Sequence, residues 1–132
     1  RDVGSALEVY IYKACLNAGV FDDVVLSAVV NWHSDGVKKS LVTNEIDVMA
    51  VHGIQPVFIS CKTCAVKTEA LNELAILRDN FGGKGSRAMI VTTSGTSRGS
   101  LTMRKRASEM GVEVLDWEDL APDTLRERLA QR

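Results

Sequence analysis

The chain has 132 residues, of which 45% are hydrophobic, and its formal net charge is −1. This is enough for one hydrophobic core but not for two, so we expect a single domain spanning residues 1–132. The near-balance of charge excludes a uniformly basic nucleic-acid-binding protein, and no apolar run is long enough to span a bilayer.

The first predicted element is an amphipathic helix over residues 2–18, with apolar residues at helical spacing and Gly19 at its end. The chain starts at Arg1, without an initiator methionine and almost directly in this helix. We therefore expect a C-terminal fragment of a longer protein. Glu8 lies at the border of the apolar face, where it either reaches a partner in the interior or stays an ordinary surface glutamate.

Three strands are expected next, arranged as an antiparallel meander. Residues 24–32 form a nearly continuous apolar run that precedes a polar turn, Ser34-Asp35-Gly36. Residues 46–51 and 56–59 are rich in Val, Ile and Phe, and the turn between them contains Gly53, which is free to adopt a positive φ. The second and third strands therefore form a hairpin.

Polar residues gather at the open end of this hairpin. Closing the turn around residues 53–55 places Asp47 opposite residues 60–62. Side chains alternate along a strand, so Ser60 and Lys62 share one face while Cys61 points to the other. An isolated buried Asp or Lys is costly, which makes Asp47 and Lys62 a candidate site. The alternative is a cross-strand salt bridge between them.

The rest of the chain alternates helices and strands. A helix over residues 68–81, with Thr68 as its expected cap, carries Glu69 and Glu73 one turn apart. The later elements are a strand at 88–93, a helix at 98–110, a strand at 112–115 and a helix at 122–130. This order predicts an α/β fold with a mixed sheet flanked by helices, in which parallel strands extend the meander.

Basic residues are concentrated in one segment. Residues 84–106 hold six of them and no acid, whereas residues 107–132 hold seven acids and three arginines. This segment is either a phosphate-facing surface or a solvated helix face. The nucleic-acid-binding candidates are Lys84, Arg87, Arg98, Arg104 and Lys105.

The three cysteines favour a reduced, cytoplasmic protein, since their number is odd and no signal peptide precedes them. Cys61 and Cys64 form a Cys-x-x-Cys pair. A zinc site needs two more ligands, and His33 and His52 lack suitable spacing, so zinc and redox chemistry are disfavoured.

Two phrases carry a resemblance to a known family. Asn44-Glu45-Ile46-Asp47-Val48 and Ile59-Ser60-Cys61-Lys62-Thr63, preceded by a helix containing Gly4 to Glu8, resemble the PD-(D/E)xK nuclease superfamily. Within it, the chain is most similar to the nuclease domain of CRISPR-associated ancillary nucleases, which follows a CARF sensor domain. The resemblance covers nearly the whole chain and implies a restriction-endonuclease-like αβββαβ core.

The resemblance also implies a function. It indicates a metal-dependent endonuclease domain that hydrolyses phosphodiester bonds in DNA or RNA. It further implies a homodimer activated when cyclic oligoadenylate binds a sensor domain outside this chain. The cofactor is then Mg²⁺ or Mn²⁺, with Asp47 as the main ligand and Glu8 and the main-chain carbonyl of Cys61 as the others. Lys62 orients the attacking water or stabilises transition-state charge.

One departure from the superfamily pattern affects the chemistry. Ser60 stands where Asp or Glu is usual, so one metal-binding carboxylate is missing. Glu8 is the first candidate to replace it, followed by Glu73 and then Glu69 on the next helix. Two alternatives remain: a Holliday-junction-resolvase-like or repair nuclease, or an inactive nucleic-acid-binding or dimerisation module that lost its metal through Ser60.

Overall fold

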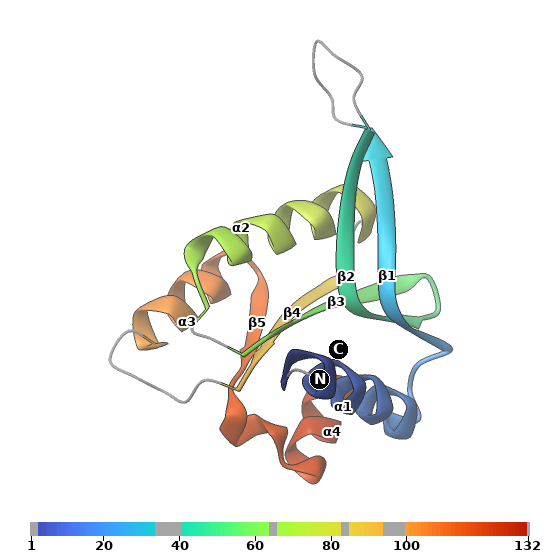
Figure 1. The fold of residues 1–132 in the computed structure, drawn as a ribbon, viewed down its shortest axis with the longest axis vertical. Coiled ribbons are helices and arrows are strands. Elements are labelled where there is room, and N and C mark those ends of the chain that lie inside the picture. Colours follow the sequence, from blue (N-terminus) through green and yellow to red (C-terminus); the bar gives the residue numbers. More distant parts are fainter. Residues whose placement is uncertain (1–2, 34–40, 64–65, 83–84, 94–99, 132) are drawn as a thin grey trace.

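The structure of the chain, a computed structural model, describes residues 3–33, 41–63, 66–82, 85–93 and 100–131. It contains one sheet whose spatial order follows the sequence (Figure 1). The strands are β1 (Asp23–His33), β2 (Leu41–His52), β3 (Gln55–Lys62), β4 (Arg87–Thr92) and β5 (Val112–Leu115). The helices are α1 (Val3–Ala18), α2 (Thr68–Leu77), α3 (Ser100–Glu109) and α4 (Pro122–Ala130), with a π-helical segment at Arg78–Gly82 and a 3₁₀ turn at Trp117–Leu120.

The predicted mixed sheet is confirmed. β1, β2 and β3 pair antiparallel, and β3–β4 and β4–β5 pair parallel. The parallel pairs are joined by α2 and α3, as expected for strands that need a crossover connection. Gly53 in the tight turn between β2 and β3 has φ 66°, a conformation that a residue without Cβ adopts at little cost.

Two apolar layers enclose the sheet. On one face, strand residues that include Val48, Ile59 and Val91 pack against α1 and α4. On the other, Phe58, Ile90 and their neighbours pack against α2 and α3. Alternate residues of one buried strand therefore serve different cores, which explains why β4 reads as a continuous apolar run. The helices lie on opposite sides of the sheet in Figure 1.

Some local predictions were wrong. The second strand begins at Leu41, five residues earlier than expected, so Asp47 lies within β2 rather than near its start. Thr68 does not cap α2: the N-cap is Lys67, without a side-chain cap, and the Thr68 hydroxyl accepts a hydrogen bond from Arg106 at 3.1 Å. The 3₁₀ turn, which is stabilised by a capping box from Asp116, was not predicted.

Other predictions fall on residues that the structure does not describe. These are the turn at Ser34–Gly36, Cys64, Lys84 and Arg98. Within the described residues, no helix is both long enough and apolar enough to cross a bilayer.

Candidate nuclease site at the end of the hairpin

The site begins where β2 and β3 stop pairing. Their backbone register runs from His52–Gln55 to Val48–Ile59. Beyond the last backbone pair, a side chain replaces the main-chain acceptor: Oδ2 of Asp47 accepts a hydrogen bond of 2.7 Å from the main-chain N–H of Cys61. A part-buried N–H needs an acceptor, so this bond holds the carboxylate against β3 and fixes its direction.

The main chain of Cys61 faces the same place. In a strand, the N–H and C=O of one residue point to the same edge, and those of the next residue point to the opposite edge. The Lys62 carbonyl accepts from the Thr93 N–H on the β4 side, so the Cys61 carbonyl points toward β2 and Asp47. The predicted pairing of Asp47 with the Cys61 carbonyl is therefore geometrically consistent.

Ser60 and Lys62 lie on the other side of β3, as the alternation predicted. Both line a small pocket of about 60 Å³ that Glu73 of α2 also lines. Both glutamates are exposed, but Glu69, one turn earlier, is not among the lining residues. Of the two glutamates on α2, Glu73 is therefore the one placed beside Ser60, where the superfamily carboxylate is missing.

Glu8 approaches from the opposite face. It is half-buried on α1, and it has contacts of its own within the protein. Burial raises the pKa of the Cys61 thiol well above its usual range, and the negative charges of Asp47 and Glu8 raise it further. Both carboxylates thus lie within electrostatic range of one thiol.

The donor chemistry fits a hard divalent cation. Mg²⁺ is commonly held by one or two carboxylates, with water and substrate phosphate completing its shell. Asp47 would supply one carboxylate and the Cys61 carbonyl a further oxygen, with Glu8 on the α1 side and Glu73 on the α2 side. Within the described ranges, no three His, Cys, Asp or Glu side chains are close enough to form a complete protein cage.

The salt-bridge alternative is wrong for this structure. Asp47 is bonded to the Cys61 N–H, and the ion pairs within the described part of the chain do not include one with Lys62. Sequence reasoning missed the Cys61 N–H as a part of the site. The strand pattern could have indicated it, because the N–H groups of successive strand residues point to opposite edges, so that of Cys61 points away from those of Ser60 and Lys62.

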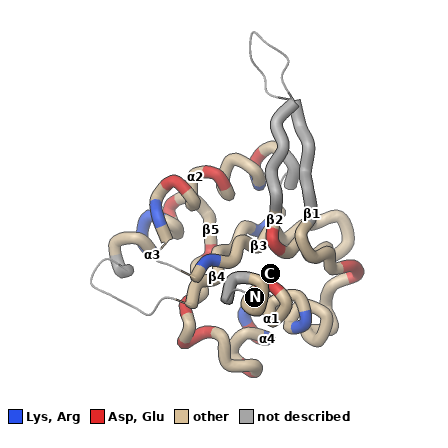
Figure 2. The backbone as a smooth tube through the Cα atoms, in the orientation of Figure 1, with Lys and Arg blue, Asp and Glu red and all other residues tan. Residues whose placement is uncertain are grey.

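The basic residues predicted to bind nucleic acid differ in whether acidic groups of the protein already pair with them. Arg87 makes a bidentate ion pair with Glu113, at 2.8 and 2.9 Å. Arg104 pairs with Asp116 at 2.6 Å and donates to the Val114 carbonyl. Both are thus held by protein groups, whereas Lys105 is exposed on α3. Figure 2 shows the basic residues of α3 beside acidic residues of α2, so this surface carries charges of both signs.

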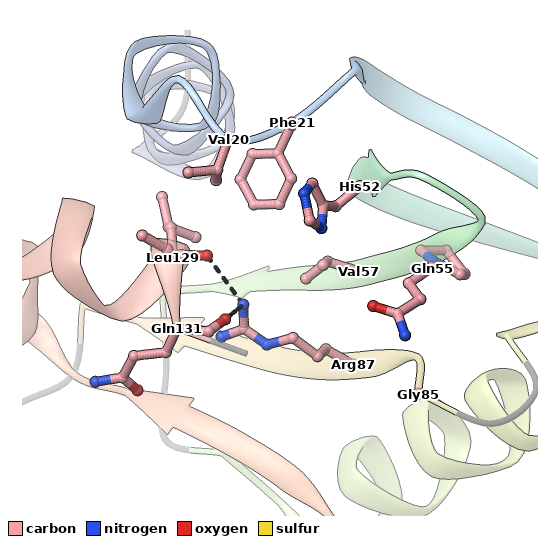
Figure 3. Close-up of a pocket in the computed structure, with 11 residues that line it drawn as sticks. Val20, Phe21, His52, Gln55, Val57, Gly85, Arg87, Leu129 and Gln131 are labelled. Carbon is pink, nitrogen blue, oxygen red and sulfur yellow. Dashed lines mark hydrogen bonds between the residues drawn. The ribbon is translucent and has the colours of Figure 1, made fainter.

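A larger cavity lies at the turn end of the hairpin, away from this site. Its volume is about 380 Å³, and Figure 3 shows its lining by His52, Gln55, Phe21 and the end of α4. Arg87 in its wall donates to the carbonyls of Leu129 and Gln131. Asp47, Ser60 and Lys62 are not among its lining residues, so the cavity is separate from the hairpin-end site.

The comparisons with known proteins concern the family and the fold. A family model described as "Card1-like, endonuclease domain" matches residues 2–132. No curated protein sequence matches the chain significantly. Among solved structures, protein VC1899 from Vibrio cholerae is 25% identical, with a TM-score of 0.78 over 96% of this chain and 33% of its own.

Two further structures share the fold at lower identity. Can2 from Sulfobacillus thermosulfidooxidans, determined in complex with cyclic tetra-adenylate, is 17% identical, with a TM-score of 0.73 over 97% of this chain and 36% of its own. The small subunit of the heterodimeric restriction endonuclease R.BspD6I is 14% identical, with a TM-score of 0.56 over 95% of this chain and 77% of its own. The chain spans about a third of the length of the first two proteins.

Proposed function

The chain belongs to the family of Card1-like endonuclease domains, and from that premise we propose that it hydrolyses phosphodiester bonds of nucleic acid with Mg²⁺ or Mn²⁺ as cofactor. The observation that carries this proposal is the Asp47 carboxylate fixed on the Cys61 N–H, at the end of the strand that carries Lys62. The Asp47 carboxylate and the main chain of Cys61 meet there, and Lys62 is the next residue of the same strand, an arrangement that favours metal-assisted hydrolysis.

Each residue has a distinct role in this proposal. Asp47 and the Cys61 carbonyl would hold the cation, which would supply charge neutralisation at the phosphoryl oxygens and a hydroxide near neutral pH. Lys62 orients the attacking water and stabilises the negative charge that develops in the transition state. Glu8 and Glu73 flank the end of β3 from its two faces and complete the negative field that attracts the cation.

We propose the same wider setting that the resemblance implied. The chain is the effector part of a longer cytoplasmic protein, active as a homodimer and switched on by cyclic oligoadenylate bound to a sensor domain outside this chain. Support comes from Can2, a similar fold within a protein about three times longer that was determined with cyclic tetra-adenylate. Ser60 favours one other candidate, an inactive nucleic-acid-binding module, because it removes a usual cation ligand.

The charge on Lys62 provides the first test. We expect Lys62→Met to slow Mn²⁺-dependent cleavage roughly a hundredfold or more, because a positioned cation that stabilises transition-state charge is lost. Lys67→Met is the matched control, since Lys67 is exposed five residues further on. Rates are measured on single- and double-stranded DNA and RNA, with and without EDTA. An inactive wild-type protein that still binds nucleic acid would support the binding module instead.

The second test asks which glutamate compensates for Ser60. Glu73 shares the pocket of Ser60 and Lys62, so we expect Glu73→Gln to lower Mn²⁺-dependent cleavage by roughly thirtyfold or more. Glu69→Gln, one turn earlier and not lining this pocket, serves as control and should cleave normally. Ser60→Glu in the Glu73→Gln background should restore part of the rate. A loss in Glu8→Gln alone would return the role to Glu8, and normal cleavage in all three Gln variants would contradict compensation.

A further inference from the structure

Ser27 has an unusual backbone conformation for its position. It lies within β1, yet its φ is +57°, and among the described residues it is the only non-glycine with a positive φ. The left-handed region is disfavoured for residues with a Cβ and incompatible with a regular strand. Such outliers persist only where the surrounding structure requires them, and they cluster at functional sites.

Asp47 lies directly across from this irregularity. The ladder between β1 and β2 pairs Leu26 with Val48 and Ala28 with Ile46, and the two residues between, Ser27 and Asp47, are left out of it. The register is the same on both sides of the gap, so neither strand carries an extra residue. Ser27 is therefore a local break in the ladder rather than a register-shifting bulge.

β2 changes its facing at the same point. Val48 packs in the core between the sheet and α1, whereas Ile46, two residues earlier, packs in the core against α2. Residues two apart on a regular strand face the same side, so the strand turns at Asp47. Figure 1 shows the far halves of β1 and β2 rising away from the rest of the sheet.

Because of this turn, the main chain of β2 does not accept the Cys61 N–H, and the Asp47 carboxylate accepts it instead. If the β2–β3 register continued past Val48–Ile59, Cys61 would lie opposite Ile46 and donate its N–H to that residue. Instead, the N–H of Cys61 donates to Oδ2 of Asp47 at 2.7 Å. The carboxylate takes this position where the β2–β3 pairing has ended, directly across from the residue at which the β1–β2 pairing is interrupted.

We infer that Ser27 is a positioning residue, whose left-handed backbone turns the β1–β2 ribbon so that Asp47 points its carboxylate at the end of β3. The inference rests on the proposed function for its catalytic consequence, but not for its structural part. Serine is not required chemically. What the position requires is a residue that tolerates a positive φ.

Three variants test it. Ser27→Val places a β-branched residue, for which a positive φ is most costly, at an exposed position. Leu26→Val is the control, on the neighbouring residue with regular strand pairing and 37% exposure. Ser27→Gly keeps the break without the Cβ penalty. Amide hydrogen exchange at Cys61 in metal-free protein, Mn²⁺ affinity and cleavage rate are measured for each.

In Ser27→Val we expect at least a tenfold loss of Cys61 amide protection, weaker Mn²⁺ binding and at least a tenfold slower cleavage. Ser27→Gly and Leu26→Val should match the wild type in all three, and Ser27→Gly should melt no lower. Unchanged Cys61 protection in folded Ser27→Val would overturn the inference, as would loss of cleavage in folded Ser27→Gly. The exchange measurement stands even if the protein cleaves nothing, so failure of the inference and failure of the proposed function are distinguishable.

Discussion

Asp47→Asn is expected to abolish cleavage while leaving the protein folded. The amide oxygen of Asn can still accept the Cys61 N–H, so the contact at the end of the hairpin is retained. What is lost is the negative charge that would hold the proposed cation. Such a cation would contribute several kcal/mol of transition-state stabilisation, so its loss corresponds to a rate reduction of roughly a thousandfold. Cleavage of labelled nucleic acid at saturating Mn²⁺ and calorimetric Mn²⁺ titration measure both effects.

Asp47→Ala separates the two roles of this side chain. It removes the charge and also leaves the part-buried Cys61 N–H without its acceptor, at a cost of about 1–2 kcal/mol relative to Asp47→Asn. The hydrogen bond from the Cys61 N–H therefore makes Asp47→Ala the less stable of the two variants. We expect equal loss of cleavage in both variants but a lower melting temperature in Asp47→Ala only. A folded Asp47→Asn that cleaves at the wild-type rate would refute the site.

The regular parts of the site could be predicted because they follow from local rules. The turn around Gly53 sets the hairpin register, and strand alternation places Ser60 and Lys62 on one face and Cys61 on the other. The helical spacing of Glu69 and Glu73 brought α2 into consideration. Strand alternation gives the face on which Ser60 lies. Which glutamate of α2 shares its pocket, Glu73 or Glu69, depends on how the helix packs on the sheet.

The irregular parts could not be predicted. The positive φ of Ser27 runs against local propensity, and it occurs across from the point where Ile46 and Val48 pack on opposite faces of the sheet. The ion pairs of Arg87 and Arg104 also could not be predicted from the sequence. A segment with basic residues and no acid indicates a phosphate surface, but Arg87 and Arg104 find their acids further along the chain, in Glu113 and Asp116. Pairing over such sequence distances is decided by the fold.

Arg87→Met is expected to destabilise the protein by about 3 kcal/mol, which lowers the melting temperature by roughly 10 °C. Its guanidinium group is bidentate to Glu113 and also donates to the carbonyls of Arg128, Leu129 and Gln131 at the end of α4. The side chain is only 16% exposed, so solvent replaces little of what is lost. Met keeps most of the volume, and the cost therefore reports the unpaired Glu113 and the uncapped helix end. Thermal and urea denaturation measure it.

Two other basic residues provide the controls. Arg126 forms an exposed i,i+3 pair with Asp123 on the same helix, so Arg126→Met should change stability by less than about 0.5 kcal/mol. Lys105→Ala should leave stability unchanged and, if α3 faces phosphate, should reduce the salt slope of nucleic-acid binding by about 1 unit. Arg87→Met at an unchanged melting temperature but with a reduced salt slope would reverse this assignment. It would make Arg87 a phosphate ligand, as the basic segment first suggested, rather than the group that joins β4, β5 and α4.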